Sequence, residues 1–215
     1  MKNKLMIMTA AVAGSLALSA SVQATTISML PGAGGVTLSG ATNSVSGGAT
    51  LLANETSTLT FLSGTGIPDV GTVQSWVYSG DANNTLNGLT FVYQVSITSG
   101  EFDHLVLDGY GFPSVVNVGY NTLTGSLLPT DVSRTSGTGN PLDFDWGSEV
   151  NSGTTYLLIV NTSIAGYANN IANLSDGETY TAAAYAPNLP DGGVTAMLLG
   201  GALSAMGLLR RKLIA

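Results

Sequence analysis

Residues 89–98, with the sequence Leu-Thr-Phe-Val-Tyr-Gln-Val-Ser-Ile-Thr, decide the fold class of this chain. Large apolar residues occupy every second position, namely Leu89, Phe91, Tyr93, Val95 and Ile97. Side chains two residues apart lie on the same face of a β-strand, and most residues between them are polar. The segment is therefore predicted to form a half-buried strand with one face towards a core.

Strand patterns recur on both sides of this segment. Residues 156–160, Tyr-Leu-Leu-Ile-Val, are apolar on both faces, which predicts a central strand. Weaker patterns predict strands at residues 57–62, 73–78, 102–107, 115–120 and 179–186. Turn sequences containing Gly, Asn and Asp separate them. Many short strands joined by such turns predict a mainly β fold, an antiparallel β-sandwich with a jelly-roll-like arrangement.

The composition agrees with a β fold and excludes several chemistries. Only 9% of the 215 residues are charged, against roughly 25% in an ordinary soluble domain. The many glycines and the few Lys, Glu and Arg residues disfavour a mainly helical protein. The absence of cysteine excludes a disulfide scaffold, a thiolate nucleophile and any metal site built on Cys.

The charge of the predicted domain, residues 25–188, is strongly negative. This segment contains twelve acidic residues and one basic residue, Arg134, so its formal net charge is 1 − 12 = −11. Such a surface repels the phosphate backbone, and we expect no nucleic-acid partner.

Residues 1–24 have the features of a secretory signal peptide. Lys2 and Lys4 provide the positive start, residues 5–20 are apolar and small, and Val-Gln-Ala at 22–24 fits a small-residue cleavage site. The mature chain is therefore predicted to begin after Ala24.

The other end of the chain carries a second apolar run, residues 194–209. In a helix this run would span about 24 Å, short of a hydrocarbon core of about 30 Å, but long basic side chains can extend to the interface. The run is predicted to be a transmembrane helix, with a buried C-terminal helix as the alternative. Residues 210–215 form the tail, whose basic residues Arg210, Arg211 and Lys212 place it in the cytoplasm.

A short motif, Leu189-Pro190-Asp191-Gly192-Gly193, precedes the apolar run. Motif, helix and basic terminus together resemble the PEP-CTERM class of bacterial sorting signals, closest to the subtype whose motif is Val-Pro-Asp-Ser-Gly. The match departs from that pattern at residues 189 and 192. The resemblance implies export in a Gram-negative bacterium that makes extracellular polysaccharide, transient insertion in the inner membrane, and processing at the motif by an exosortase. Taken by itself, the motif also suits a simple turn between domain and anchor.

The inventory of catalytic groups excludes most enzyme classes. A Ser-His-Asp triad would need His104, the only histidine, as its base. This residue is predicted to be an ordinary half-exposed histidine at the start or edge of a strand. We therefore expect no enzymatic activity.

Three acidic residues, Asp143, Asp145 and Glu149, form the strongest candidate for a polar site. The first two lie two residues apart, which places both carboxylates on one face of a strand. With loop carbonyl groups, the three side chains could bind Ca²⁺, a hard cation that prefers oxygen ligands. A glycosidase carboxylate pair and a solvated acidic turn are the alternatives.

Aromatic residues near turns suggest sugar stacking. The best candidates are Tyr110, Phe112 and Trp146, which have Asp or Gly neighbours, and the alternative is that these rings fill the core.

Together these patterns predict an exported, exosortase-sorted structural protein of the cell surface, outer membrane or extracellular matrix, associated with exopolysaccharide or biofilm. A carbohydrate-binding module on the same scaffold is the first alternative, and a secreted glycosidase is the second.

Overall fold

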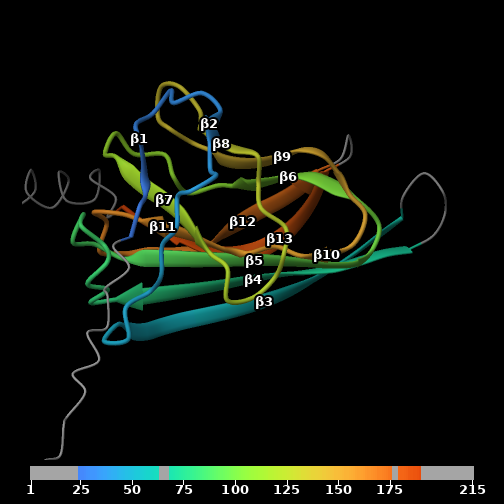
Figure 1. Ribbon diagram of the computed structural model, residues 1–215, viewed down its shortest axis with the longest axis horizontal. Helices are drawn as coiled ribbons and strands as arrows, with labels where there is room; N and C mark the ends of the chain where they lie inside the picture. Colours follow the sequence, from blue (N-terminus) through green and yellow to red (C-terminus); the bar gives the residue numbers. More distant parts are fainter. Residues whose placement is uncertain (1–23, 63–67, 176–178, 190–215) are drawn as a thin grey trace, which may run out of the picture.

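Figure 1 presents the computed structural model of the chain, which describes residues 24–62, 68–175 and 179–189. Within these residues the chain forms strands and no helix, and the named strand pairs are all antiparallel. The mainly β prediction with antiparallel sheets is therefore confirmed. The predicted signal peptide before Ala24 and the predicted helix at 194–209 lie outside the described residues.

The strands form two sheets. The first has the order β1-β7-β11-β5-β4-β3, and β10 also pairs with β5. Its strands are β1 (Ile27–Met29), β3 (Thr50–Leu62), β4 (Pro68–Ser79), β5 (Thr90–Ser99), β7 (Val116–Asn121), β10 (Gly153–Thr154) and β11 (Leu157–Asn161). The second has the order β13-β12-β6-β9-β8-β2. Its strands are β2 (Val36–Thr37), β6 (Phe102–Leu107), β8 (Asp131–Arg134), β9 (Leu142–Val150), β12 (Tyr167–Ser175) and β13 (Thr179–Pro187).

A single hydrophobic core lies between the two sheets, which form two layers in Figure 1. Its fully buried side chains include Phe91, Tyr93 and Val160 from the first sheet and Leu105, Leu142 and Phe144 from the second. These residues alternate along their strands with residues that face outwards, as expected when a sheet buries one face against another.

At one edge the sheets approach each other closely. Apart from Leu174, the buried inward positions of β12 and β13 carry small side chains, namely Ala172, Ala182, Ala184 and Ala186. This leaves room for direct polar contacts between the sheets: the Tyr185 amide donates to Ser75 Oγ at 3.0 Å, and Ser57 Oγ donates to the Ala183 carbonyl oxygen at 2.9 Å. Small side chains therefore close the core at this edge.

The predicted strands recur in the structure. The central position of residues 156–160 is confirmed, since β11 lies between β7 and β5, and 102–107 matches β6. The segments 57–62, 73–78, 115–120 and 179–186 fall within or overlap β3, β4, β7 and β13. In the described part of the chain, no helix is long and apolar enough to span a membrane.

The half-buried character predicted for residues 89–98 is wrong for most of β5. The outward-facing residues Thr90, Val92 and Gln94 are 0%, 3% and 8% exposed, so this stretch is buried on both faces. The physical reason is that loops cover these outward positions, the segment at Asp81 over Thr90 and the loops described below over Val92 and Gln94.

Candidate functional site

Arg134, the only basic residue of the domain, is buried in the structure and 1% exposed. Its five N–H groups all donate to backbone carbonyl oxygens: Nε to Gly139 at 3.0 Å, Nη1 to Met29 at 3.1 Å and Ser114 at 2.6 Å, and Nη2 to Tyr110 at 2.8 Å and Phe112 at 2.6 Å. The guanidinium also packs over the Phe112 ring. Burial lowers the pKa of Arg134, but the group stays protonated because its ordinary pKa lies far above neutrality. The side chain therefore fastens the end of β1 and two loops, 108–115 and 135–141, to β8, and it is not available to a ligand.

A glycine is required beside this guanidinium. Gly139 has a φ of +82°, and a Cβ at this position would lie 2.8 Å from Arg134 Nε. A larger residue at position 139 would strain the backbone and displace the cation.

The aromatic residues predicted to stack on sugars are core residues, and that prediction is wrong. Tyr110, Phe112 and Trp146 are 0%, 2% and 7% exposed, so none presents an open ring face. The Tyr110 hydroxyl is 2.8 Å from the Tyr93 hydroxyl, and Trp146 packs edge-on against Phe102 at a centroid distance of 4.9 Å. The alternative, that these rings fill the core, is the correct one.

A register shift creates a polar cluster on the outer face of the second sheet. The pairing of β6 with β9 is irregular between Phe102 and His104. Phe102 and Leu105 both face the core, so Asp103 and His104 both lie on the outer face. On β9, Asp143 and Asp145 face the same side, as predicted from their spacing.

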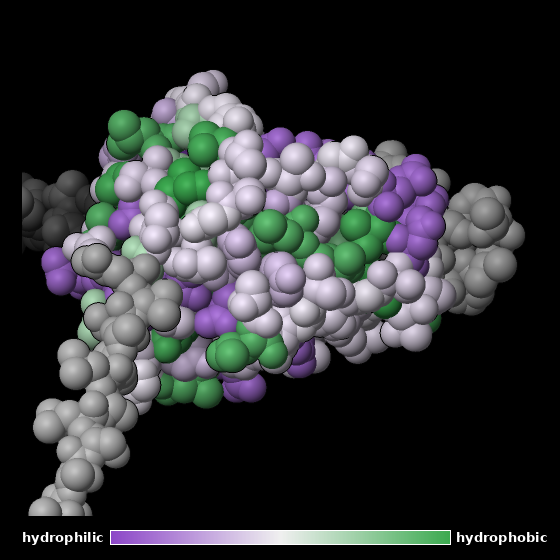
Figure 2. Space-filling model, in the orientation of Figure 1, coloured by the Kyte–Doolittle hydropathy of each residue, from purple (hydrophilic) through white to green (hydrophobic). Residues whose placement is uncertain are grey.

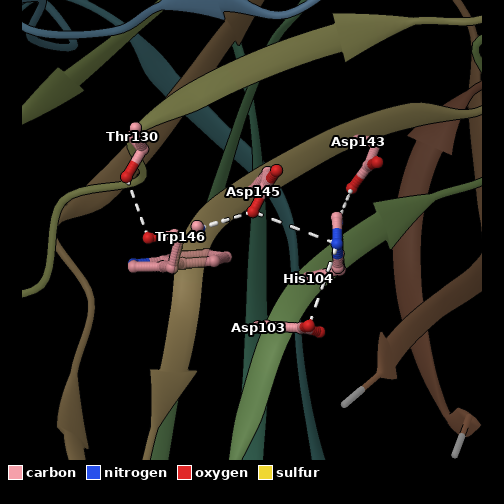
Figure 3. Close-up of polar contacts among 7 residues, drawn as sticks. Asp103, His104, Thr130, Asp143, Asp145 and Trp146 are labelled. Atoms are coloured by element: carbon pink, nitrogen blue, oxygen red, sulfur yellow. Dashed lines mark hydrogen bonds and ion pairs between the residues drawn. The ribbon is translucent and has the colours of Figure 1, made fainter. Parts of the chain in front are cut away.

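The imidazole of His104 lies among three carboxylates (Figure 3). Its Nδ1 is 3.0 Å from Asp143 Oδ1, and its Nε2 is 3.9 Å from both Asp103 Oδ2 and Asp145 Oδ1. The Asp145 carboxylate also accepts a 2.5 Å hydrogen bond from the Gly147 amide, which closes the turn after it. The half-exposed position predicted for His104 is confirmed, but two of its three partners, Asp143 and Asp145, come from β9, which is far away in the sequence.

This cluster shifts the titration of two groups. Partial burial by itself would lower the pKa of His104, but the hydrogen bond to Asp143 and the charges of Asp143, Asp103 and Asp145 raise it above 6.5. Burial raises the pKa of Asp143, and its hydrogen bond to His104 opposes that change. The cluster is thus a set of carboxylates that share one imidazolium.

The three residues predicted to bind calcium are not all brought together. Asp143 and Asp145 share a face beside His104, whereas Glu149 is exposed near the end of β9. In residues 24–62, 68–175 and 179–189, no group of three or more His, Asp or Glu side chains has the arrangement of a metal site. Calcium binding therefore stays a prediction.

A cavity of about 350 Å³ lies on the outer face of the first sheet, and we call it the outer groove. It is lined by Trp76 and Tyr78 of β4, Val92 and Gln94 of β5, and Leu157 and Ile159 of β11. Val92 and Ile159 are 3% and 1% exposed, although they face away from the main core. The groove is thus a second apolar site, separated from the core by the sheet itself.

Two loops form the rim of the outer groove. Val45 and Thr124 lie against the outer face of the sheet, and Gln94 Nε2 donates to Thr124 Oγ1 and to the Thr155 carbonyl oxygen, both at 2.9 Å. Gly125 has a φ of +80°, and a Cβ there would collide with the Thr155 carbonyl oxygen. This close approach of the loop covers Gln94 on the outer face of β5, whereas Thr90 on the same face is covered by Asp81, to which its Oγ1 donates at 2.9 Å.

Apolar side chains on the face seen in Figure 2 form separate patches between polar ones. Singly exposed apolar residues are normal on a soluble surface, so a concave apolar site with defined polar groups is the more informative feature. Trp76 and Tyr78 also lie near a turn in the sequence but were not the best stacking candidates, although their spacing of two residues places both rings on one face of a strand.

Comparison of the chain with protein-family models, with curated proteins and with solved structures finds no match.

The predicted processing sites lie at the borders of the described residues. Ala24 is half-buried and Leu189 is 44% exposed. The rest of the motif and the basic tail, Pro190, Asp191, Gly192, Gly193, Arg210, Arg211 and Lys212, lie outside the described residues.

Proposed function

We propose that this chain is an exported structural protein of the cell surface or extracellular matrix, without enzymatic activity, and that an exosortase processes it at residues 189–193. The observation that carries the proposal is the position at which the folded domain ends. β13 ends at Pro187, the Asn188 amide donates to the Gly166 carbonyl oxygen at 3.0 Å, and Leu189 is exposed. A cut in the motif would remove none of the described strands, because they all precede it.

The surface chemistry supports a solvated role outside the cell. Arg134 is buried, so among the described residues the exposed ionic groups are carboxylates and one imidazole, His104. A negative surface of this kind resists non-specific association with anionic envelope components. In the proposal the two sheets form a jelly-roll-like sandwich that remains stable after the tail has been removed.

The membrane steps of the proposal rest on the two termini of the sequence. Lys2 and Lys4 at one end, and the basic tail at the other, keep both ends in the cytoplasm while the domain crosses the inner membrane. The short apolar run at 194–209 then presents the motif to the processing enzyme on the outer side.

The proposal is tested by the intact mass of the exported protein in a host that carries an exosortase. The parent chain is expected to begin at Thr25 and to end within residues 189–193. A variant with Arg210→Gln, Arg211→Gln and Lys212→Gln is expected to keep its C-terminus at Ala215, because loss of the basic charges lets the run slip through the membrane.

The matched control keeps the charges: Arg210→Lys, Arg211→Lys and Lys212→Arg together should leave processing unchanged. The proposal fails if the parent and the neutral variant give the same mass and both extend beyond Lys212.

A further inference from the structure

Two aromatic rings of the outer groove lie on the same face of one strand. Trp76 and Tyr78 are both half-buried, and residues two apart in a strand are separated by about 7 Å along its length. Val92 pairs with Trp76 on the next strand and Ile159 pairs with Val92 on the strand after it, and both are almost fully buried. The groove therefore offers two partly open ring faces over an apolar floor.

The polar groups of the groove are neutral and few. Both amide hydrogens of Gln94 are held by Thr124 Oγ1 and the Thr155 carbonyl oxygen, which leaves the amide oxygen as the acceptor of this side chain. The side chain is only 8% exposed, so its orientation is fixed by the protein. The indole N–H of Trp76 adds a donor, and the Tyr78 hydroxyl can donate or accept.

The charges in and around the outer groove favour a neutral ligand over an anionic one. Among residues 24–62, 68–175 and 179–189, no Asp, Glu, Lys, Arg or His lines the outer groove, and the domain around it has a formal charge of −11 with its single Arg buried. An anionic ligand would be repelled and would find no cation to pair with. A neutral sugar has apolar C–H faces that suit aromatic rings and hydroxyl groups that suit an amide and a phenol.

We propose that the outer groove binds a neutral polysaccharide chain, with sugar rings stacked on Trp76 and Tyr78 and a sugar hydroxyl donating to the amide oxygen of Gln94. The floor residues Val92 and Ile159 exclude water beneath the chain. Binding at this groove is independent of tail processing, so the two proposals fail separately.

The chain has two tryptophans, which allows a paired fluorescence experiment on the exported protein. In a Trp146→Phe variant the emission comes from Trp76 alone. It should change saturably on titration with one of three neutral probes: a dextran, a linear β-1,4-glucan oligosaccharide or a galactomannan oligosaccharide. In a Trp76→Phe variant the emission comes from the buried Trp146 and should not respond to the same probe.

Native gel electrophoresis in gels that contain the responding polysaccharide measures the affinity of the remaining variants. Trp76→Ala and Tyr78→Ala should each bind about tenfold more weakly or worse, because each loses a stacking surface. The matched control is Tyr167→Ala on the second sheet, which removes a half-buried tyrosine outside the groove and should keep parent affinity. Near-ultraviolet circular dichroism verifies that each variant is folded.

The proposal is overturned if none of the three neutral probes changes the emission of Trp76, or if folded Trp76→Ala binds as tightly as the parent. Binding to an anionic alginate alone would also overturn it. So would a change in Trp76 emission when residues 194–209 are removed from the full-length, unprocessed chain without any sugar, because the groove would then hold the chain's own apolar run.

Discussion

The guanidinium carbon of Arg134 lies 4.8 Å from the ring centroid of Phe112, and Nη2 of the same side chain donates a 2.6 Å hydrogen bond to the Phe112 carbonyl oxygen. The cation thus contacts both the side chain and the backbone of one residue in a buried site. Its other four donors hold the backbone at Met29, Tyr110, Ser114 and Gly139. No acidic side chain is among these partners, so the positive charge is compensated by carbonyl dipoles.

Arg134→Met should lower the free energy of unfolding by about 3–5 kcal/mol, because buried carbonyl groups lose their donors. Arg134→Lys should recover little of this loss, since an ammonium has three donors and no planar fork. Urea denaturation monitored by circular dichroism measures both variants. Ser133→Ala, at the adjacent outward position of β8, is the control and should change the value by less than about 0.5 kcal/mol. If Arg134→Met also lowered the free energy of unfolding by less than about 0.5 kcal/mol, the guanidinium would not be holding these segments.

Two buried tyrosines should differ in their contribution to stability. The Tyr93 hydroxyl donates to the Tyr185 carbonyl oxygen at 2.6 Å, so the 2.8 Å contact between the two phenols has Tyr110 as donor. Burial raises the pKa of both phenols, which stay protonated at neutral pH. Tyr93→Phe should lower the free energy of unfolding by about 1–3 kcal/mol, because it leaves the Tyr185 carbonyl oxygen and the Tyr110 hydroxyl unpaired. Tyr110→Phe should lower it by less, because it removes only the last donor in this chain of hydrogen bonds. Equal losses, or the reverse order, in urea denaturation would contradict this assignment of donors.

His104 should titrate above its ordinary pKa of 6.5, because the hydrogen bond to Asp143 and the nearby carboxylates outweigh partial burial. The chain has one histidine, so its imidazole gives a single set of proton NMR signals to follow with pH. Asp143→Asn should lower this pKa, whereas Glu149→Gln, an exposed change farther along β9, should leave it nearly unchanged. A pKa at or below 6.5 in the parent would show that the carboxylates do not govern the imidazole.

The same shift sets the sign of a stability effect. A histidine whose pKa is raised by folding stabilises the protein fully below pH 6.5, and this contribution is lost as the pH rises through the folded-state pKa. As the pH rises from slightly acid to slightly alkaline, the thermal unfolding midpoint of the parent should therefore fall more steeply than that of His104→Gln. Thermal unfolding at several pH values measures both.

Local alternation predicted the inward residues of β5 and the central position of β11, because side-chain direction in a strand depends only on neighbours along the chain. It missed β12, where the sequence Tyr-Ala-Asn-Asn-Ile-Ala-Asn-Leu-Ser is rich in Asn and weakly apolar. There, Ala172 and Leu174 are the buried inward side chains. A strand that buries alanine against a closely packed sheet has little hydrophobic pattern to detect.

The candidate sites depended more on the fold. The spacing of Asp143 and Asp145 predicted one shared face, but their contact with His104 requires the pairing of β6 with β9 and its register shift. The same spacing rule applied to Trp76 and Tyr78, yet only the covering loops at Val45 and Thr124 turn that face into a groove. Conversely, Tyr110, Phe112 and Trp146 have turn-like neighbours in sequence and are nevertheless buried.

The sequence by itself determined the β class, the acidic and cysteine-free chemistry, and the motifs at the two ends that motivate the export proposal. These are properties of composition or of residues close together in the chain. The tertiary structure decided that Arg134 is a buried structural cation, that His104 lies among carboxylates, and that Trp76 and Tyr78 line the outer groove. The physical reason is that burial, hydrogen-bond partners and pKa depend on residues far away in sequence. The folded backbone alone brings those residues together.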